Sequence, residues 1–330
     1  MTGPPVTIRR ATHEDLPAIL ALGGRSLGWE PGAPTAAHFA WKHFDNPFGA
    51  SPMWVAEAEG RLAGFRTFLR WEFETGSGER RRAVRAVDTA TDPDFQGRGV
   101  FRALTLGALD ELRAEGVDFV FNTPNAKSRP GYLKMGWQAL GRLPVALRPT
   151  GPRALARLPR ARRAADRGAL ACSIGEPAAE VLRDPGTAAR LLAHRRRPRA
   201  HDALTTARSP EYLAWRYGPA PLHYRVVWSR DRSGAGVFHL RRRGAAIEAV
   251  ICEVLVAGGA RSAEYDILRR IARESGADYL LRLHTPAEPL ARGFVPAPGL
   301  GPLLTTRAVS RPAVAERASW WLTLGDVELF

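Results

Sequence analysis

The chain has few cysteines and no long apolar segment. Only Cys172 and Cys252 occur among its 330 residues, and their separation suggests neither a disulfide framework nor a zinc site. We therefore expect buried thiols and no bound metal. No apolar run approaches the ~18 residues that a membrane-spanning helix needs. The N-terminal residues also lack the apolar core of a signal peptide. These absences predict a cytoplasmic protein without a membrane partner.

Lysine is also scarce, although the chain is strongly basic. The 48 Lys and Arg residues outnumber the 33 Asp and Glu residues and leave a net charge of +15. Lysine occurs only as Lys42, Lys127 and Lys134, so nearly all of the excess is arginine. Abundant Arg, Ala, Gly and Pro are typical of a GC-rich coding sequence, and a basic surface suits acyl-CoA as well as nucleic acid. The basic clusters lack the interleaved aromatic residues of a stacking platform, so we do not expect a nucleic-acid partner.

The first half of the chain alternates strand and helix signals. Apolar or alternating runs predict strands at residues 6–10, 53–58, 61–74, 80–91, 117–121 and 137–147. Helical periodicity predicts helices that begin at Thr12 or cover residues 34–44, 100–112 and 125–135. Thr12 and Asp15 form an approximate capping box. These elements predict an α/β fold, a mixed sheet with helices on both faces.

The most informative segment is residues 92–102, which joins a predicted strand to a predicted helix. It contains Gln96, Gly97, Arg98 and Gly99. A glycine-bearing turn before a helix directs unpaired N–H groups and the positive end of the helix dipole at one point, which suits a pyrophosphate. Glycine at both positions would let the backbone approach this ligand without obstruction by a Cβ.

A second motif follows about 30 residues later, with Asn125, Ser128, Tyr132, Gly136 and Trp137 in fixed spacing. The patterns Gln-x-x-Gly-x-(small) and Asn-x-x-(Ser/Ala)-x-x-x-Tyr-x-x-x-Gly-aromatic together resemble the GCN5-related N-acetyltransferases, the GNAT superfamily. The resemblance covers residues 6–148 and implies acetyl-CoA as the cofactor. It implies cofactor contacts from Val87, Thr89, Ala90, Gln96, Gly97, Arg98, Gly99, Val100, Phe101, Arg102, Asn125 and Ser128.

The resemblance also implies catalytic roles. Tyr132 would protonate the departing coenzyme A thiolate, since a phenol is protonated at neutral pH; the alternative is a purely structural Tyr132. Asp88 lies on the strand before the first motif, where the family often places a carboxylate that acts as a base. Small and apolar neighbours would raise the pKa of a buried Asp88. Alternatively, Asp88 orders the local turn or pairs with Arg85.

Three further expectations concern the reaction. The early helices of the family wall the acceptor pocket, which makes Trp41, His43, Asp45 and Asn46 candidate substrate-binding residues. Asp326, Glu328 and the terminal carboxylate of Phe330 are further candidates for the base. Transfer is expected to be direct, in a ternary complex, because no cysteine lies in the motif region.

Phe101 departs from the family pattern, because it stands where the first motif usually has a small residue. Either the family tolerates this bulk, or Phe101 alters or blocks the cofactor site.

The second half of the chain contains a faint repeat of the first. Residues 39–43 (Phe-Ala-Trp-Lys-His) are echoed by residues 213–217 (Leu-Ala-Trp-Arg-Tyr), and a similar order of strands and helices follows. The repeat has no Gln-x-x-Gly turn and no counterpart of Asn125 or Tyr132. We therefore predict a GNAT domain with the acetyl-CoA site at residues 1–148, an Arg/Ala/Pro-rich connector at 149–199, and a degenerate GNAT-like domain at 200–330.

These observations predict an acetyl-CoA-dependent N-acetyltransferase that acts on a small primary amine, such as an amino sugar, an antibiotic or an amino-acid derivative. It would act as a monomer or homodimer. One alternative is an aminoacyl-transferase of the peptidoglycan-bridge type, although the intact Gln-x-x-Gly turn counts against it. The other is a non-catalytic binding protein with nucleic-acid affinity.

Overall fold

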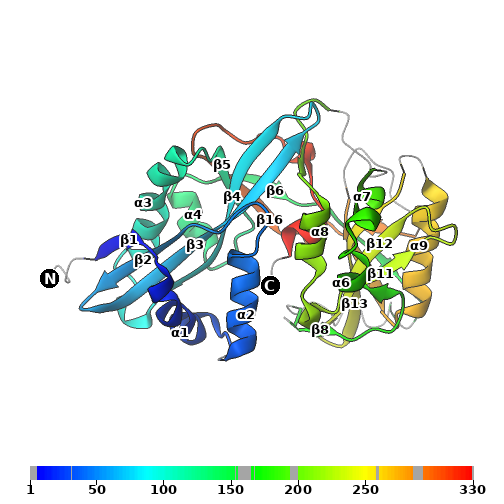
Figure 1. The fold of residues 1–330 in the computed structure, drawn as a ribbon, viewed down its shortest axis with the longest axis horizontal. Coiled ribbons are helices and arrows are strands. Elements are labelled where there is room, and N and C mark those ends of the chain that lie inside the picture. Colours follow the sequence, from blue (N-terminus) through cyan, green and yellow to red (C-terminus); the bar gives the residue numbers. More distant parts are fainter. Residues whose placement is uncertain are drawn as a thin grey trace. The chain divides into compact units, whose positions relative to one another are not determined.

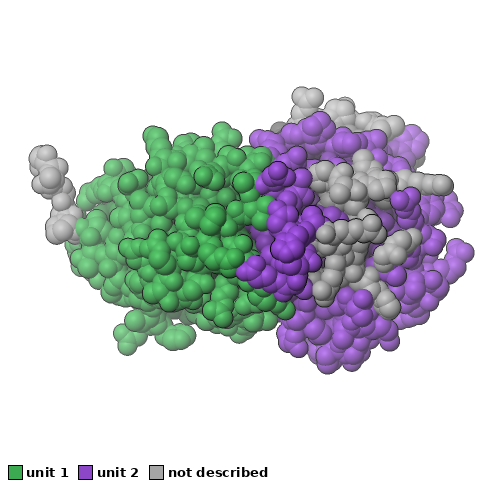
Figure 2. Space-filling view, turned by 90° about the horizontal axis from the view of Figure 1, so that it is seen from above, with its two compact units in different colours: residues 1–73, 80–141, 302–315 green, residues 74–79, 142–301, 316–330 purple. Residues whose placement is uncertain are grey.

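The chain divides into two compact units. The computed structural model describes residues 6–30, 32–152, 154, 165–166, 168–193, 200–257, 260–284 and 293–328. Unit 1 comprises residues 1–73, 80–141 and 302–315, and unit 2 comprises residues 74–79, 142–301 and 316–330 (Figure 2). Each unit therefore contains segments from both halves of the sequence.

Unit 1 is built on a mixed sheet with the order β1-β2-β3-β4-β5-β16-β6 (Figure 1). Its strands are β1(Thr7–Arg10), β2(Met53–Ala58), β3(Arg61–Thr75), β4(Arg80–Thr91), β5(Phe119–Asn122), β6(Gln138–Arg142) and β16(Leu303–Ala308). The β1–β2 and β2–β3 pairs are antiparallel, and β4 pairs with β5 in parallel. A parallel pair needs a crossover, which a helix provides here.

Helices cover both faces of this sheet, as the sequence predicts. They are α1(Leu16–Leu27), α2(Ala33–His43), α3(Val100–Ala114) and α4(Arg129–Lys134). Trp54 of β2 belongs to a core that contains Leu104 of α3 and Tyr132 of α4. The next residue, Val55, belongs to a second core with Ile19 of α1. Neighbouring strand residues therefore serve opposite faces, as expected from the pleat.

Most predicted elements of unit 1 are confirmed, and the differences occur at their ends. The capping box of Thr12 and Asp15 is present, and it begins a short 3₁₀ helix, η1(His13–Asp15), ahead of α1. Another 3₁₀ helix, η2(Pro93–Phe95), follows β4. The helix predicted over residues 125–135 covers only residues 129–134, because the segment before Arg129 forms a turn around the side chain of Asn125.

The predicted strand at residues 137–147 is wrong as a single element. It is divided into β6, in the sheet of unit 1, and β7(Val145–Pro149), in the sheet of unit 2. Pro144 lies at the break and has no N–H to donate to a ladder. The place beside β5 is taken by β16, which pairs with it antiparallel, and Thr305 Oγ1 donates to Asn122 Oδ1 at 2.6 Å. The units therefore do not divide at the predicted boundaries.

Unit 2 contains a second mixed sheet, with the order β15-β7-β14-β13-β12-β11-β9 and with β8 beside β12. In addition to β7, its strands are β8(Ala169–Leu170), β9(Glu176–Pro177), β11(Arg225–Trp228), β12(Ala235–Arg243), β13(Ala246–Leu255), β14(Tyr279–Leu283) and β15(Val295–Pro296). β10(Leu204–Thr206) pairs with β17(Trp320–Trp321). As β4 does with β5, β13 pairs in parallel with β14 after an antiparallel meander.

The helices that lie wholly within the described residues of unit 2 are α6(Ala178–Val181), α7(Pro185–Ala193), α8(Pro210–Tyr217), α9(Arg261–Glu274) and α10(Leu324–Val327), with the 3₁₀ helices η4(Ala220–Leu222) and η5(Arg317–Ser319). Part of the predicted connector thus forms elements of unit 2, from β8 to α7. The basic clusters at residues 160–163 and 195–197 lie outside the described residues. No helix in the described part of the chain is long and apolar enough to cross a membrane.

Candidate active site

The turn between β4 and α3 has the geometry that the first motif predicts. Gly97 and Gly99 have φ angles of 76° and 78°, in the left-handed region that glycine enters at little cost. A Cβ at either position would have no heavy atom within 4 Å, so the backbone faces open space. Gly99 is the N-cap of the 15-residue α3 and provides no side-chain acceptor for its first N–H groups. With Gln96 and Arg98 exposed beside it, this turn can receive phosphate groups.

The first residues of α3 point in different directions. Val100 is buried in the core and Arg102 is exposed. Phe101 is half-buried, and its ring centre lies 5.4 Å from that of Tyr132 at an interplanar angle of 85°. A Cβ on Gly131 would lie only 2.9 Å from Phe101 Cε1. The ring of Phe101 therefore packs against α4, in space that Gly131 leaves free.

Strand β4, which is predicted to contact the cofactor, continues past the end of its ladder with β5. The β4–β5 ladder covers Ala83–Arg85 on β4, whereas β4 itself extends to Thr91. Residues 83–86 are buried, and Val87, Asp88 and Thr89 are half-buried. Asp88 has a φ angle of 36°, which residues other than glycine rarely adopt. Val87, Thr89 and the buried Ala90 thus belong to a strand segment beyond the ladder.

Asp88 belongs to a cluster of charged and polar side chains. Its Oδ2 lies 2.7 Å from Lys42 Nζ and 2.9 Å from His43 Nε2, both on α2. His43 is fully buried, and its Nδ1 lies 2.9 Å from Ser51 Oγ. Arg85 instead donates to Thr123 Oγ1 at 3.2 Å. Among the described residues, Asp88 therefore forms an ion pair with Lys42 and a hydrogen bond with His43.

The cluster reverses the pKa shift expected for Asp88. Burial raises the pKa of this carboxyl, but the charge of Lys42 and the hydrogen bond from His43 outweigh it and bring the pKa below its ordinary value. The predicted rise is therefore wrong. Burial lowers the pKa of His43, so its imidazole is neutral at pH 7. Since ionised Asp88 only accepts, His43 Nε2 carries the proton and Nδ1 accepts from Ser51 Oγ.

Tyr132 is 3% exposed, and a buried arginine engages its hydroxyl group. Arg66 on β3 donates from Nη2 to Tyr132 Oη at 2.6 Å. Because a guanidinium group only donates, the phenol oxygen must accept, and the proton of Tyr132 is directed elsewhere. The O–H bond of Tyr132 therefore points away from Arg66.

Asn125 and Ser128 organise the start of α4. Asn125 Oδ1 accepts from Lys127 N at 3.0 Å, from Ser128 N at 2.9 Å and from Ser128 Oγ at 3.1 Å. The side chain of Asn125 is exposed, but these contacts engage its carbonyl oxygen. A direct contact of either residue with a cofactor stays a prediction.

Comparison with known families identifies a family for the segment that contains these features. A family model described as an acetyltransferase (GNAT) domain matches residues 7–140. This segment is a GNAT domain. Mycothiol acetyltransferase from Saccharomonospora viridis is 30% identical to the chain over 137 residues, which cover 38% of this chain and 44% of that protein. The match therefore spans less than half the length of this relative.

Solved structures resemble nearly the whole chain. A conserved protein from Enterococcus faecalis, described as a probable N-acyltransferase, has a TM-score of 0.64 at 15% identity and covers 93% of this chain and 73% of its own. A GCN5-related N-acetyltransferase from Anabaena variabilis has a TM-score of 0.61 at 14% identity, with coverage of 92% and 73%. At these identities the likeness shows the fold. The predicted fold class, a mixed α/β fold with two GNAT-like sheets, is confirmed.

The residues predicted to line the acceptor pocket of the GNAT domain lie in different environments. His43 is fully buried, and Asn46 is buried with Nδ2 donating to the carbonyl oxygen of Arg70 at 2.8 Å. Asp45 is exposed and Trp41 is half-buried. His43 and Asn46 thus connect the end of α2 to the sheet. Contact of Trp41 or Asp45 with a substrate stays a prediction.

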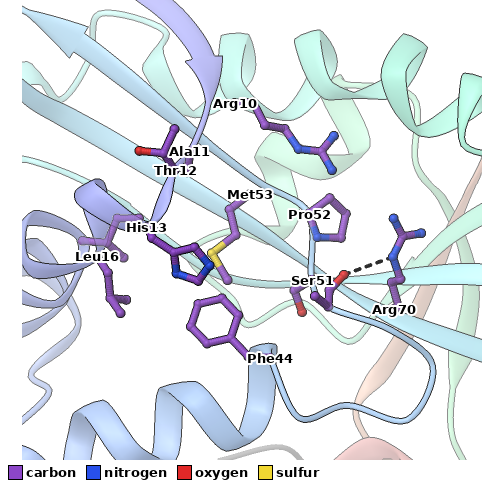
Figure 3. Close-up of a pocket in the computed structure, with 12 residues that line it drawn as sticks. Arg10, Ala11, Thr12, His13, Leu16, Phe44, Ser51, Pro52, Met53 and Arg70 are labelled. Carbon is purple, nitrogen blue, oxygen red and sulfur yellow. Dashed lines mark hydrogen bonds between the residues drawn. The ribbon is translucent and has the colours of Figure 1, made fainter.

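A cavity of about 420 Å³ in the GNAT domain opens near the end of α2 (Figure 3). Its lining residues come from β1, α1, β2, β3 and the segments beside them: Arg10, Ala11, Thr12, His13, Leu16, Ile19, Phe44, Ala50, Ser51, Pro52, Met53 and Arg70. None of the four predicted acceptor residues lines it. Ser51 connects the cavity wall to His43 and, through it, to Asp88.

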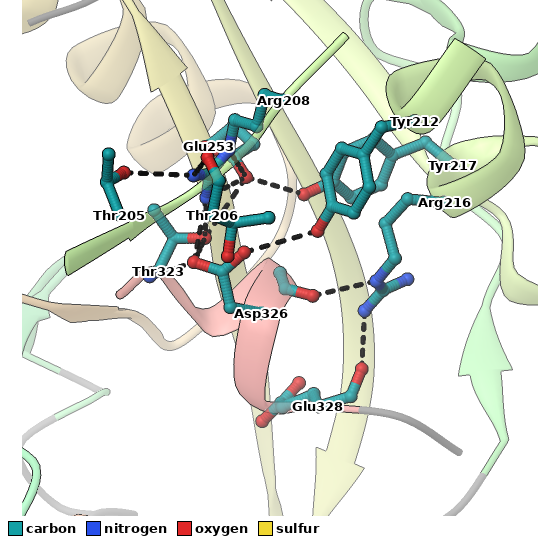
Figure 4. A network of polar contacts seen from close by, with 11 residues as sticks. Thr205, Thr206, Arg208, Tyr212, Arg216, Tyr217, Glu253, Thr323, Asp326 and Glu328 are labelled. Carbon is teal, nitrogen blue, oxygen red and sulfur yellow. Dashed lines mark hydrogen bonds and ion pairs between the residues drawn. The ribbon is translucent and has the colours of Figure 1, made fainter. Parts of the chain in front are cut away.

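Unit 2 repeats the arrangement around Asp88 with other side chains (Figure 4). The parallel ladders begin at Ala83 on β4 and at Glu248 on β13. Asp88 and Glu253 each follow the first residue of their ladder by five positions, so the two carboxylates correspond. Tyr217 Oη on α8 donates to Glu253 Oε1 at 3.0 Å, as His43 on α2 contacts Asp88. The sequence echo of residues 39–43 and 213–217 thus places corresponding residues at corresponding carboxylates.

The C-terminal segment of unit 2 fills the space beside Glu253. Arg208 Nη2 lies 2.8 Å from Glu253 Oε1 and 2.8 Å from Asp326 Oδ2 (Figure 4). A Cβ on Gly325 would lie 2.0 Å from Tyr217 Oη, so α10 packs tightly on α8. Asp326 is therefore fully engaged within unit 2.

Glu328 and the terminal carboxylate of Phe330 are the two other candidate bases at the C-terminus. Glu328 Oε1 lies 2.8 Å from Arg241 Nη2, so this carboxylate has a partner within unit 2. Phe330 lies outside the described residues.

Sequence analysis missed Lys42, Ser51 and Arg66. Arg66 lies in an alternating strand, on the same face as Phe68, which is buried. A charge at an inward position was therefore an available signal. Lys42 precedes His43 in a helix and is a rare residue type in this chain. Nothing in the local sequence of Ser51 indicates its contact with His43.

Proposed function

We propose that the protein transfers an acetyl group from acetyl-CoA to a small amine. The observation that carries this proposal is the exposed turn at Gly97 and Gly99, which leads into α3 within a GNAT domain. The relative named mycothiol acetyltransferase supports acetyl as the transferred group and a small molecule as the acceptor.

The residues of the turn fit the phosphates of coenzyme A, because both glycines leave room and the first N–H groups of α3 have no side-chain cap. The arrangement of β4 favours Val87, Thr89 and Ala90 as contacts of the pantetheine arm. The remaining proposed contacts are Gln96, Arg98, Val100, Phe101, Arg102, Asn125 and Ser128. When bound, acetyl-CoA supplies an activated acetyl thioester.

The proposed proton chemistry assigns different tasks to Tyr132 and Asp88. Tyr132 holds its proton at Oη and would donate it to the leaving sulfur. Asp88 is ionised at neutral pH because its pKa is lowered, and it is therefore a weak base. We assign it to attracting and orienting the acceptor ammonium group, which must lose a proton to solvent before attack.

The cavity at Ser51 supports an acceptor of modest size, since cavities of about 300–1,000 Å³ hold small molecules. The counterpart site in unit 2 contains Arg208 and α10, and we propose that unit 2 binds no acetyl-CoA. The cytoplasmic location and the monomeric or dimeric state remain predictions.

Calorimetric titration with acetyl-CoA tests the proposal. We expect micromolar binding to the wild type and none to Gly99→Trp, because an indole in the turn would cover the phosphate site. Gly107→Trp is the matched control, since Gly107 lies on the exposed side of α3 with open space around a Cβ. Release of free thiol on addition of small amines would then identify the acceptor.

A folded wild type that fails to bind acetyl-CoA would contradict the proposal. Steeply salt-dependent binding to random-sequence DNA would in that case favour the non-catalytic alternative.

A further inference from the structure

Arg66 is a buried charge without a counter-charge among the described residues. Its side chain on β3 has no exposed surface. Nε and Nη1 have no hydrogen-bond partner in the described part of the chain. The rings of Phe68, Phe101 and Tyr132 surround the guanidinium at 5.0, 5.4 and 5.3 Å. Burial of a charge is costly unless an opposite charge or hydrogen bonds compensate it.

Two other buried arginines are paired with carboxylates. In unit 1, Arg81 Nε lies 3.0 Å from Asp118 Oδ2. In unit 2, Arg208 lies between two carboxylates at 2.8 Å. Within the described part of the chain, the hydrogen bond of Arg66 goes instead to a phenol, Tyr132. Arg66 is therefore placed to stabilise a negative charge that develops beside Tyr132 during the reaction.

Phe101, which departs from the family pattern, belongs to the same group of side chains as Arg66 and Tyr132. Phe101 packs edge-on against Tyr132 and lies over Arg66. An apolar ring at this place keeps water from the guanidinium and strengthens its interaction with any charge nearby.

We propose that Arg66 is a positioning residue for proton donation by Tyr132. By donating to Tyr132 Oη, Arg66 directs the phenol proton away from itself, and its charge stabilises the negative charge that develops when the coenzyme A sulfur departs. This inference rests on the proposed function.

The proton balance of the step is as follows. The amine nitrogen bonds to the acetyl carbon as the carbon–sulfur bond breaks, and the electron pair of that bond stays on sulfur. Tyr132 Oη gives its proton to the sulfur, and the resulting phenolate keeps its hydrogen bond from Arg66 Nη2. The proton lost by the attacking nitrogen then returns, through solvent, to the phenolate, so Tyr132 and Arg66 end as they began.

Binding of coenzyme A and of desulfo-coenzyme A, in which hydrogen replaces the thiol, tests the inference without catalysis. At an alkaline pH of 8.5 a fraction of the coenzyme A thiol is ionised, and this thiolate resembles the departing sulfur. We expect the wild type to bind coenzyme A about tenfold more tightly than the desulfo compound, the effect of about one charge-assisted hydrogen bond. Arg66→Met and Tyr132→Phe should bind both compounds alike, and Arg66→Lys should keep part of the preference.

Arg81→Met is the matched control, because it removes another buried arginine of unit 1 and should retain the preference. Binding without any preference for the thiol in the wild type would overturn the inference and leave the proposed function standing. No binding of either compound would overturn both. Loss of the preference in Arg81→Met as well would assign the effect to the fold and would also overturn the inference.

A kinetic measurement separates positioning from packing. We expect Arg66→Met to lower kcat about tenfold to a hundredfold with the acceptor KM unchanged, the range for one hydrogen bond to a charged group. The double variant Arg66→Met/Tyr132→Phe should be no slower than Tyr132→Phe alone, because Arg66 acts through Tyr132. Additive losses, or an effect on KM alone, would contradict the positioning role.

Discussion

Replacement of Lys42 by Met should destabilise unit 1, because it leaves Asp88 without a charged partner. Lys42 Nζ lies 2.7 Å from Asp88 Oδ2, and the two side chains are only 4% and 17% exposed. Methionine is also unbranched, so the substitution removes the charge with little change in packing. The remaining partner, His43, is neutral at pH 7 because burial lowers its pKa. The carboxylate of Asp88 would then be a buried charge that a neutral imidazole alone compensates.

The expected size of this loss follows from the geometry. At an effective dielectric constant of ~20, charges 2.7 Å apart attract by about 6 kcal/mol, and desolvation of both groups offsets part of this. Removal of one partner from a buried ion pair costs about 3–5 kcal/mol. Because Asp88 retains some exposure, we expect the lower end, about 3 kcal/mol. For a unit of about 150 residues this corresponds to a fall of ~6–12 °C in Tm.

Thermal and urea unfolding of the full chain at pH 7.5 measure the effect. Hydrogen exchange of the β4 amides should be followed as well, because two units need not unfold in one transition. Lys134→Met is the matched control, since Lys134 is exposed on α4. A loss below about 1 kcal/mol, the value of a surface pair, or a loss equal to that of the control, would refute this account of Lys42.

The structure supports three other predictions. The folded-state pKa of His43 is lowered, so the unfolded chain binds the extra proton below pH ~6.5 and stability falls as the pH drops through that value. His43→Gln should therefore reduce the pH dependence of the stability of unit 1 between about pH 7 and pH 5. An unchanged slope would count against a neutral His43. Gly131→Ala should cost about 1–3 kcal/mol through overpacking against Phe101, and Phe101→Leu should relieve this in the double variant; strict additivity in urea unfolding would contradict the contact. Arg208→Met should destabilise unit 2 by about 3–5 kcal/mol, because Glu253 and the neighbouring Asp326 would share a buried site without a cation; calorimetry that shows no lower Tm would contradict it.

Local patterns were sufficient for the turn at Gly97 and Gly99 and for most helices and strands. The glycines mark a left-handed backbone, and hydrophobic periodicity separates a strand from a helix within a few residues, so neighbours in sequence carry the information. The same patterns predicted the family. They failed at residues 137–147, where the run reads as one strand although it is divided between two sheets.

The environment of each catalytic candidate could not be predicted in the same way. The pKa of Asp88 depends on the Lys42 charge, which is 46 positions away in sequence but 2.7 Å away in space. Small neighbours in the strand suggested a buried carboxyl with a raised pKa, whereas the folded chain supplies a cation. Likewise, the motif predicted a catalytic role for Tyr132, but it did not indicate that Arg66 would donate to the hydroxyl group of this tyrosine.

The amino-acid sequence alone therefore identifies the turn at Gly97 and Gly99, the helix that follows it and the candidate residues on both, because these features result from backbone conformation and contacts between near neighbours. Only the folded chain decides which charges meet Asp88, what surrounds Tyr132, and that β16 lies between β5 and β6. These outcomes depend on pairing between distant segments, where a shift of one residue in a strand turns a side chain from the core to the opposite face.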